Sequence, residues 1–475
     1  MKPNRRASPA GRLAGVLLAC IGGGCVSADL PSELSRQLAQ ATGNAELLRL
    51  EIEGEPLDAP GPAGDTLTLA GAIRQSMAHS PDIQAALARV RAAQADALQA
   101  RLLPNPLLRV VVRFPEGGMS PDIEAELAAE LIDLLRRPGR VSAADSRLRA
   151  AASDAVSQAL DVVADVEERY AAVQALEEHL RILGERLRIV ERLLELARDR
   201  LALGEGTRLD VLTFEARVME LEAEVADREL EQEVERLALA RLIGRPSGAI
   251  AWQLAVWEIR DDPRVEESRW IAVALQSRPE VQAKKYELEA LGADLSLTRF
   301  APFLDGSAGA EGERGDGAWA VGPTIAVPVP LFDFGQAKRQ RAYAALIEAR
   351  HDLTSLERLV VEEVRRAVAS LAASRKNLER VRERLVPAAQ LRYEQAEAQF
   401  RAGQTDVAGL LIAEEELHAA RNRLVQVERR NAEAVFRLQR AVGGPGVVTE
   451  LGQDVATAST PVPSDGVVPT KEDSR

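Results

Sequence analysis

Long stretches of the chain place an apolar residue at every third or fourth position, as a helix packed along a partner requires. The clearest stretch opens at Pro138-Gly139 and runs to about Leu203, which predicts a helix about 100 Å long at 1.5 Å per residue. Gly204-Glu205-Gly206 ends it, and residues 209–242 are predicted to return antiparallel. The recurring apolar positions are Leu180, Leu183, Leu187, Val190, Leu194, Ala197 and Leu201.

Short segments with a period of two lie between the helical stretches. Residues 107–114 and 122–132 alternate apolar with charged side chains, and residues 304–313 and 319–329 form a weaker pair. A soluble sheet that covers a core gives the same alternation. About ten residues with one apolar and one polar face is also the pattern of a transmembrane barrel strand, and several copies of the chain would have to close such a barrel.

The chain is internally duplicated. A shift of about 198 residues aligns the segment 80–85 with 278–283, and Gly204 then lies within one position of Gly403. Such a repeat indicates that one structural unit is used twice. Each unit is predicted to run helix, hairpin, long helix, turn, helix; the first helix is 67–101 and the second long helix is 335–401.

These patterns divide the chain into six parts. They are a signal peptide with a lipobox at 1–25, a leader at 26–65, a first repeat at 66–247, a linker at 248–267, a second repeat at 268–443 and a disordered tail at 444–475.

Composition supports a mainly helical protein and argues against nucleic-acid binding. Aromatic residues make up only 3% of the chain, while helix-forming Ala, Leu, Glu and Arg dominate. The net charge of −13 leaves no concentrated basic surface for phosphate contacts.

The amino terminus has the order of an export signal. Basic residues precede the apolar run 13–21, and three glycines follow it. Both cysteines of the chain lie here, and we expect lipidation at Cys25, with Cys20 as the alternative. A signal peptide that is cut nearby without lipidation remains the other interpretation.

The segment 328–335, Pro-Val-Pro-Leu-Phe-Asp-Phe-Gly, closely resembles the strand-to-helix signature of the TolC outer-membrane efflux protein family. The segments 80–85 and 204–212 are similar to that family as well, and the resemblance covers about residues 65–443. Proline cannot donate to a strand ladder, and glycine lets the chain bend into a helix. The signature residues are Pro330, Leu331, Phe332, Asp333 and Gly335.

This resemblance implies a mainly α fold with a small β part, built from duplicated helix-hairpin-helix units. It implies a homotrimer with a 12-stranded outer-membrane β-barrel that continues into a long periplasmic α-helical barrel. The implied partners are outer-membrane lipid, a periplasmic adaptor protein and an inner-membrane RND-type pump, and the implied cargo is a drug or a metal ion. With the lipobox, the resemblance points to the lipoprotein subgroup of the family.

Two positions depart from the family pattern. Residues 132–139 lack the full signature, so the join in the first repeat is expected to differ, and Gly409 stands where the family often has Asp. We expect the turns with Gly204 and Gly403 to form the periplasmic end, closed at rest by Arg208, Asp210 and Asp406.

No catalytic constellation is apparent, so we expect a transport pathway without enzymatic activity, cofactor or metal site. His79, His179, His351 and His418 lie on predicted helices without ligand spacing and are expected at the surface. Two alternatives stay open: a periplasmic structural or adaptor coiled coil that never spans a membrane, and a type I protein secretion channel of the same family.

Overall fold

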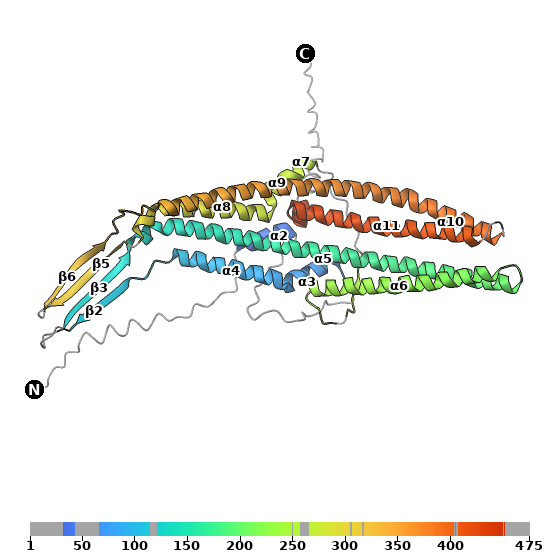
Figure 1. Cartoon of the computed structure of the whole chain (residues 1–475), viewed down its shortest axis with the longest axis horizontal. Helices are drawn as coiled ribbons and strands as arrows, with labels where there is room; N and C mark the ends of the chain where they lie inside the picture. The colour runs from blue at the N-terminus through green and yellow to red at the C-terminus, as the bar shows by residue number, and fades with distance from the viewer. Residues whose placement is uncertain are drawn as a thin grey trace, which may run out of the picture.

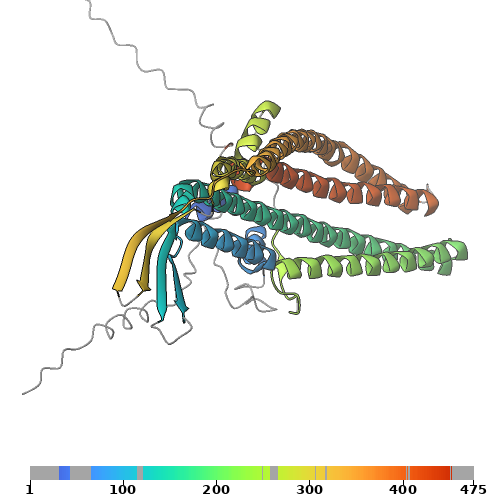
Figure 2. The ribbon, with the colours of Figure 1, turned by 60° about the vertical axis from the view of Figure 1, so that its left-hand side comes forward.

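The computed structural model is an elongated molecule with a small sheet at one end and helical hairpins that reach away from it (Figure 1). Figure 2 shows that the strands leave the helical body at an angle. The structure describes residues 32–42, 66–114, 121–248, 250–256, 266–304, 306–315, 318–402, 404, 407–449 and 451. The predicted signal peptide at 1–25, with both cysteines, lies outside these residues.

Both repeats have the same order of elements, which confirms the predicted mainly helical, duplicated fold class. The first repeat contains α3 (Leu69–His79), α4 (Pro81–Arg101), β2 (Leu107–Arg113), β3 (Asp122–Glu130), α5 (Leu131–Ala202) and α6 (Arg208–Leu242). The second contains α7 (Glu267–Ser277), α8 (Pro279–Leu297), η1 (Thr298–Phe303), β5 (Ser307–Gly315), β6 (Ala318–Ala326), α9 (Gln336–Arg380), η2 (Val381–Leu385), α10 (Val386–Arg401) and α11 (Val407–Val442).

The helix predicted over 67–101 is in fact two helices, α3 and α4. They meet at Ser80-Pro81, because proline has no N–H to continue the ladder of α3 and instead opens α4. The Ser80 hydroxyl accepts a hydrogen bond from the Ile83 N–H at 3.5 Å and caps the new helix.

The hydrophobic core is divided among several clusters along the helical body. One joins α2 (Ser32–Thr42), α4 and α5, and it buries Leu34, Leu38 and Ala41 of the predicted leader. Another joins α7, α9 and α11, and a third joins α5 and α6 to α10 and α11. The two repeats are thus packed against each other along much of α5.

The four longer strands form one antiparallel sheet in the order β2-β3-β5-β6. The register places Leu108 opposite Leu127, Leu127 opposite Ala310, and Ala310 opposite Pro323. Since side chains alternate along each strand, Leu108, Leu127, Ala310 and Pro323 share one face.

The strand limits differ from the predicted ones at the helix junctions. The pair predicted at 304–313 and 319–329 lies at Ser307–Gly315 and Ala318–Ala326, because η1 takes the chain to Phe303. The strand predicted to reach 132 ends at Glu130, where α5 begins.

The structure contains two short elements that were not predicted from the sequence. Within the linker, β4 (Gln253–Leu254) pairs in parallel with β1 (Thr66–Leu67). The tail predicted as disordered from 444 begins instead with a helical turn at 445–449, whose Val447 and Val448 are buried. These apolar side chains pack near α7 and α11, which explains why this part of the tail is ordered.

Candidate functional site

The second repeat passes from strand to helix through the signature segment. Gly335 precedes α9 with φ +75°, and a Cβ there would lie 3.1 Å from the Ala301 Cβ. The Asp333 carboxylate accepts a hydrogen bond from the Gly335 N–H at 2.7 Å, and the Gln336 side chain accepts one from the Phe334 N–H at 2.8 Å. Glycine is therefore required here by both conformation and space.

The apolar signature side chains point to solvent in the single chain. Leu331 is 69% exposed, Phe332 90% and Phe334 59%, while Pro330 is half-buried. Exposed aromatic side chains next to an apolar strand face are typical of the boundary between a bilayer and water.

The join of the first repeat differs, as the missing signature suggests. The prediction that Pro138-Gly139 opens the helix was wrong, because α5 begins at Leu131 and contains Pro138. Asp133 in its first turn accepts hydrogen bonds from Arg136 at 3.3 Å and Arg140 at 3.0 Å. The segment 131–137 has no proline or glycine to stop a helix, so the strand runs directly into α5.

The sheet has two chemically distinct faces. On one face the strands carry Leu108, Val110, Ile123, Ala125, Leu127, Ala310, Val321 and Ile325, and several of these side chains are more than half exposed. On the other face Arg113 pairs with Glu124 at 2.8 Å, and Glu126 lies opposite Glu311. A sheet with one exposed apolar face and one charged face fits a wall between lipid and water.

The turn between α5 and α6 is closed by local hydrogen bonds. Gly204 has φ +77°, and the Glu205 and Gly206 N–H groups both donate to the Arg200 carbonyl. Thr207 and Asp210 form a capping box, with the Asp210 N–H donating to the Thr207 hydroxyl at 3.2 Å and the Thr207 N–H donating to the Asp210 carboxylate at 3.0 Å.

Of the tip residues predicted to form a gate, the structure describes Gly204, Arg208 and Asp210. Asp210 is engaged in capping its own helix, and Arg208 is exposed. Gly403 and Asp406 lie outside the described residues.

A buried ion pair joins the two hairpins above this turn. Arg186 of α5 donates to both carboxylate oxygens of Glu414 on α11, at 2.7 and 3.0 Å, and both side chains are 5% exposed. His418 was predicted at the surface but is only 7% exposed, and its Nδ1 lies 3.1 Å from Arg186 Nη1. Burial, followed by the charge of Arg186, lowers the pKa of His418 to about 3. The ring is therefore neutral, and its Nδ1 accepts a hydrogen bond from the Arg186 guanidinium.

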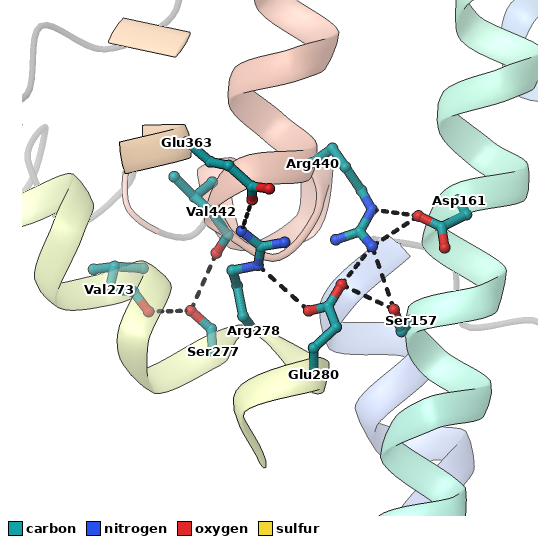
Figure 3. Close-up of polar contacts among 9 residues, drawn as sticks. All are labelled: Ser157, Asp161, Val273, Ser277, Arg278, Glu280, Glu363, Arg440 and Val442. Atoms are coloured by element: carbon teal, nitrogen blue, oxygen red, sulfur yellow. Dashed lines mark hydrogen bonds and ion pairs between the residues drawn. The ribbon is translucent and has the colours of Figure 1, made fainter. Parts of the chain in front are cut away.

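A second polar network ties the repeats together nearer the sheet (Figure 3). Arg440 of α11 donates to Asp161 of α5 at 2.8 Å and also to Glu280 of α8. Arg278 donates to Glu280 at 3.3 Å and to Glu363 of α9. Although burial acts to raise it, the pKa of Glu280 is lowered to about 2, because the charges of Arg440 and Arg278 outweigh desolvation.

Sequence reasoning missed these buried charges. Arg186 and Glu414 are 228 positions apart, and both look like ordinary charged positions on a solvated helix. The internal shift aligned Ser80-Pro81 with Arg278-Pro279, but it gave no indication that Arg278 is buried.

Other chemistry is sparse in the part of the chain that is described. No group of three or more His, Cys, Asp or Glu side chains is placed to hold a metal ion among these residues. None of the helices described combines the length and the apolar character that crossing a bilayer demands.

Known proteins share both this sequence pattern and this fold. The profile of the outer membrane efflux protein family matches residues 72–245 and 270–444. The chain is 23% identical to the cobalt-zinc-cadmium resistance protein CzcC of Cupriavidus metallidurans, over 82% of this chain and 92% of that one. It is 27% identical to the outer membrane efflux protein BepC of Brucella suis, over 55% and 58% of the two chains.

Among solved structures, the outer membrane protein VceC of Vibrio cholerae superposes with a TM-score of 0.66 at 22% identity, over 79% of this chain and 96% of that one. This likeness concerns the fold alone. Because the family profile matches both repeats and therefore most of the chain, the protein belongs to the outer membrane efflux protein family.

Proposed function

We propose that three copies of this chain form an outer-membrane channel that exports small molecules. The observation that carries this proposal is the four-stranded sheet, whose apolar face is exposed and whose outer strands, β2 and β6, have no further strand partner among the described residues. Four strands leave open edges that lipid cannot satisfy. Three copies would supply twelve strands, an even number within the range of known barrels.

The helices support a tunnel below the barrel. At 1.5 Å per residue, the 72 residues of α5 extend about 108 Å from the sheet. In the trimer these helices would line a continuous path across the periplasm. A lipid on Cys25, or alternatively Cys20, would add an anchor in the same membrane.

The cargo in this proposal is a drug or a metal ion, delivered by a periplasmic adaptor and an RND-type pump. The name of the similar protein CzcC, which refers to cobalt, zinc and cadmium resistance, supports a metal ion as the cargo. Deleting the gene and measuring growth on these metals and on hydrophobic drugs separates the two cargoes.

We further propose that the hairpin turns form the gated periplasmic end. Arg208 is exposed beside the capped turn, where it could meet a carboxylate of another hairpin, for which Asp406 is the candidate. Because Asp210 already caps α6, replacing Arg208 alone is the cleaner test. Unchanged single-channel conductance in Arg208→Ala would count against a gate at this residue.

Planar-bilayer conductance of the detergent-purified protein, with its oligomeric mass measured on the same sample, tests the channel. Discrete conductance steps from a trimer are expected. A monomer or dimer that stays soluble without detergent would favour the periplasmic coiled coil, and loss of an exported protein on gene deletion would favour the secretion channel.

Two neighbouring residues give a matched pair of variants. Val110 lies on the apolar face, whereas Val111 lies on the charged face opposite Glu124. Val110→Arg should impair membrane insertion, since a charge on the lipid face costs about 2–4 kcal/mol near the bilayer centre. Val111→Arg should insert normally, and equal behaviour of both variants would contradict the assignment of the faces.

A further inference from the structure

Four basic side chains surround the point where the second repeat leaves the sheet. Arg299 lies in η1, and Lys338, Arg339 and Arg341 lie at the start of α9. All four are exposed, and none forms an ion pair or a side-chain hydrogen bond with another residue that the structure describes. The Arg299 guanidinium instead covers the Phe300 ring at 4.7 Å.

The position of these charges is unfavourable for the isolated helix. The first turn of a helix carries the positive end of its dipole and disfavours cations, yet the first turn of α9 has no acidic residue. The first repeat differs, because Asp133 in the first turn of α5 pairs with Arg136 and Arg140. Among the described residues, no ion pair holds these four cations of the second repeat.

A cavity of about 470 Å³ lies among these residues, between the end of α8 and the start of α9. Its walls include Leu295, Thr298, Arg299, Arg339 and Tyr343, so it combines apolar surface with two guanidinium groups. The exposed signature side chains Leu331, Phe332 and Phe334 lie in the segment between β6 and α9.

We propose that this basic cavity binds the headgroup and upper acyl chain of an anionic phospholipid in the periplasmic leaflet of the outer membrane. The inference rests on the proposed channel function, which places the sheet in the bilayer. Guanidinium and ammonium groups just outside an apolar belt attract anionic headgroups. The apolar walls favour a lipid over a free anion, because only a lipid has a hydrocarbon part to place there.

Native mass spectrometry of the full-length, delipidated oligomer provides the test. The oligomer is titrated with phosphatidylglycerol and with phosphatidylcholine of the same acyl chains. The wild type should bind phosphatidylglycerol about tenfold more tightly or better, since each nearby cation strengthens binding to an anionic surface. The triple variant Lys338→Gln, Arg339→Gln, Arg341→Gln and the single variant Arg299→Gln should each reduce this preference, with the triple variant losing most of it.

A matched control lies on the same helix, farther from the sheet. Arg350→Gln, Arg358→Gln and Lys376→Gln remove the same charges from exposed positions of α9 and should leave the lipid preference unchanged. Equal loss in both triple variants would show a general charge effect and would overturn the site.

Two further outcomes are decisive. Full displacement of the lipid by millimolar inorganic phosphate would identify a plain anion site and overturn the lipid assignment, whereas no displacement would support it. An oligomer that conducts but shows no preference between the lipids would contradict the lipid site and leave the proposed channel function intact. Failure to form a detergent-dependent oligomer would instead contradict the proposed channel function.

Discussion

The two repeats enter their long helices in different ways. Residues 131–137 are helical in the first repeat, while the aligned residues 329–335 are non-helical and end at Gly335. Proline at 330 and a glycine with positive φ prevent helix formation in the second, and neither is present in the first. Duplication has thus kept the architecture while the local backbone at the same join has diverged.

The long helices differ again farther from the sheet. The first repeat keeps α5 continuous over 72 residues, whereas α9 and α10 are separated by the π-helical turn η2 directly before Pro387. In this turn the Val386 N–H donates to the Val381 carbonyl, five residues back. The extra residue widens the helix where Pro387 would clash with the preceding turn.

The largest expected effect comes from separating the two repeats at their buried ion pair. Arg186→Ala should lower the free energy of unfolding by about 3–5 kcal/mol, because Glu414 would be left charged and unpaired in the core. Denaturant unfolding followed by helical circular dichroism measures this. Arg181→Ala, which breaks an exposed pair with Glu178 on the same helix, should cost less than about 1 kcal/mol.

The same contact predicts a pH dependence. The pKa of His418 is lowered to about 3 by burial and by Arg186. On acidification, this histidine is therefore protonated in the unfolded chain while it stays neutral in the folded chain. Stability should therefore fall, by an amount on the order of a few kcal/mol, as the pH drops from about 6.5 toward 3. His418→Gln should remove this part of the slope, and identical slopes in both proteins would refute the assignment.

A smaller effect should appear at the joins. Gly335→Ala should destabilise the protein by about 1–2 kcal/mol, since alanine is strained at positive φ and its Cβ would crowd Ala301. The aligned Arg137→Ala lies inside α5 and should change stability by less than about 1 kcal/mol. Thermal unfolding of both variants compares the two joins directly, and equal losses would mean that the joins are equivalent.

The smallest effect concerns the turn of the first hairpin. Thr207→Ala removes the hydroxyl that caps α6 and should cost about 1 kcal/mol. Thr213→Ala, six residues farther along the chain, removes a hydroxyl that donates to the Leu209 carbonyl within α6, and it should be nearly neutral. Amide hydrogen exchange near the turn distinguishes local fraying from a global loss of stability.

Patterns along the chain predicted the helices, the four strands and the unlike joins. The periodicity of a buried helix stripe or of a two-faced strand involves residues that are close in the sequence, so it can be recognised without knowledge of the fold. Helix limits were less predictable. The sequence of residues 131–137 is compatible with both a strand and a helix. The close approach of α8 to α5 is visible only in the structure, where a Cβ at Gly139 would lie 2.6 Å from the Leu297 side chain.

Burial of charge could not be predicted in the same way. His418 and Glu414 look like surface residues because their own helix is rich in charge, and they become interior only when α5 packs against α11. The energy of such contacts depends on partners more than two hundred positions away.

The sequence alone determined that this protein is a duplicated, mainly helical chain with two amphipathic hairpins and a glycine-dependent join at 335, since each of these depends on local periodicity and backbone preference. The tertiary structure decided which charges are buried between the repeats and that Leu108, Leu127 and Ala310 of three different strands lie on the same face. Those features depend on register and on contacts between distant segments, which no local pattern specifies.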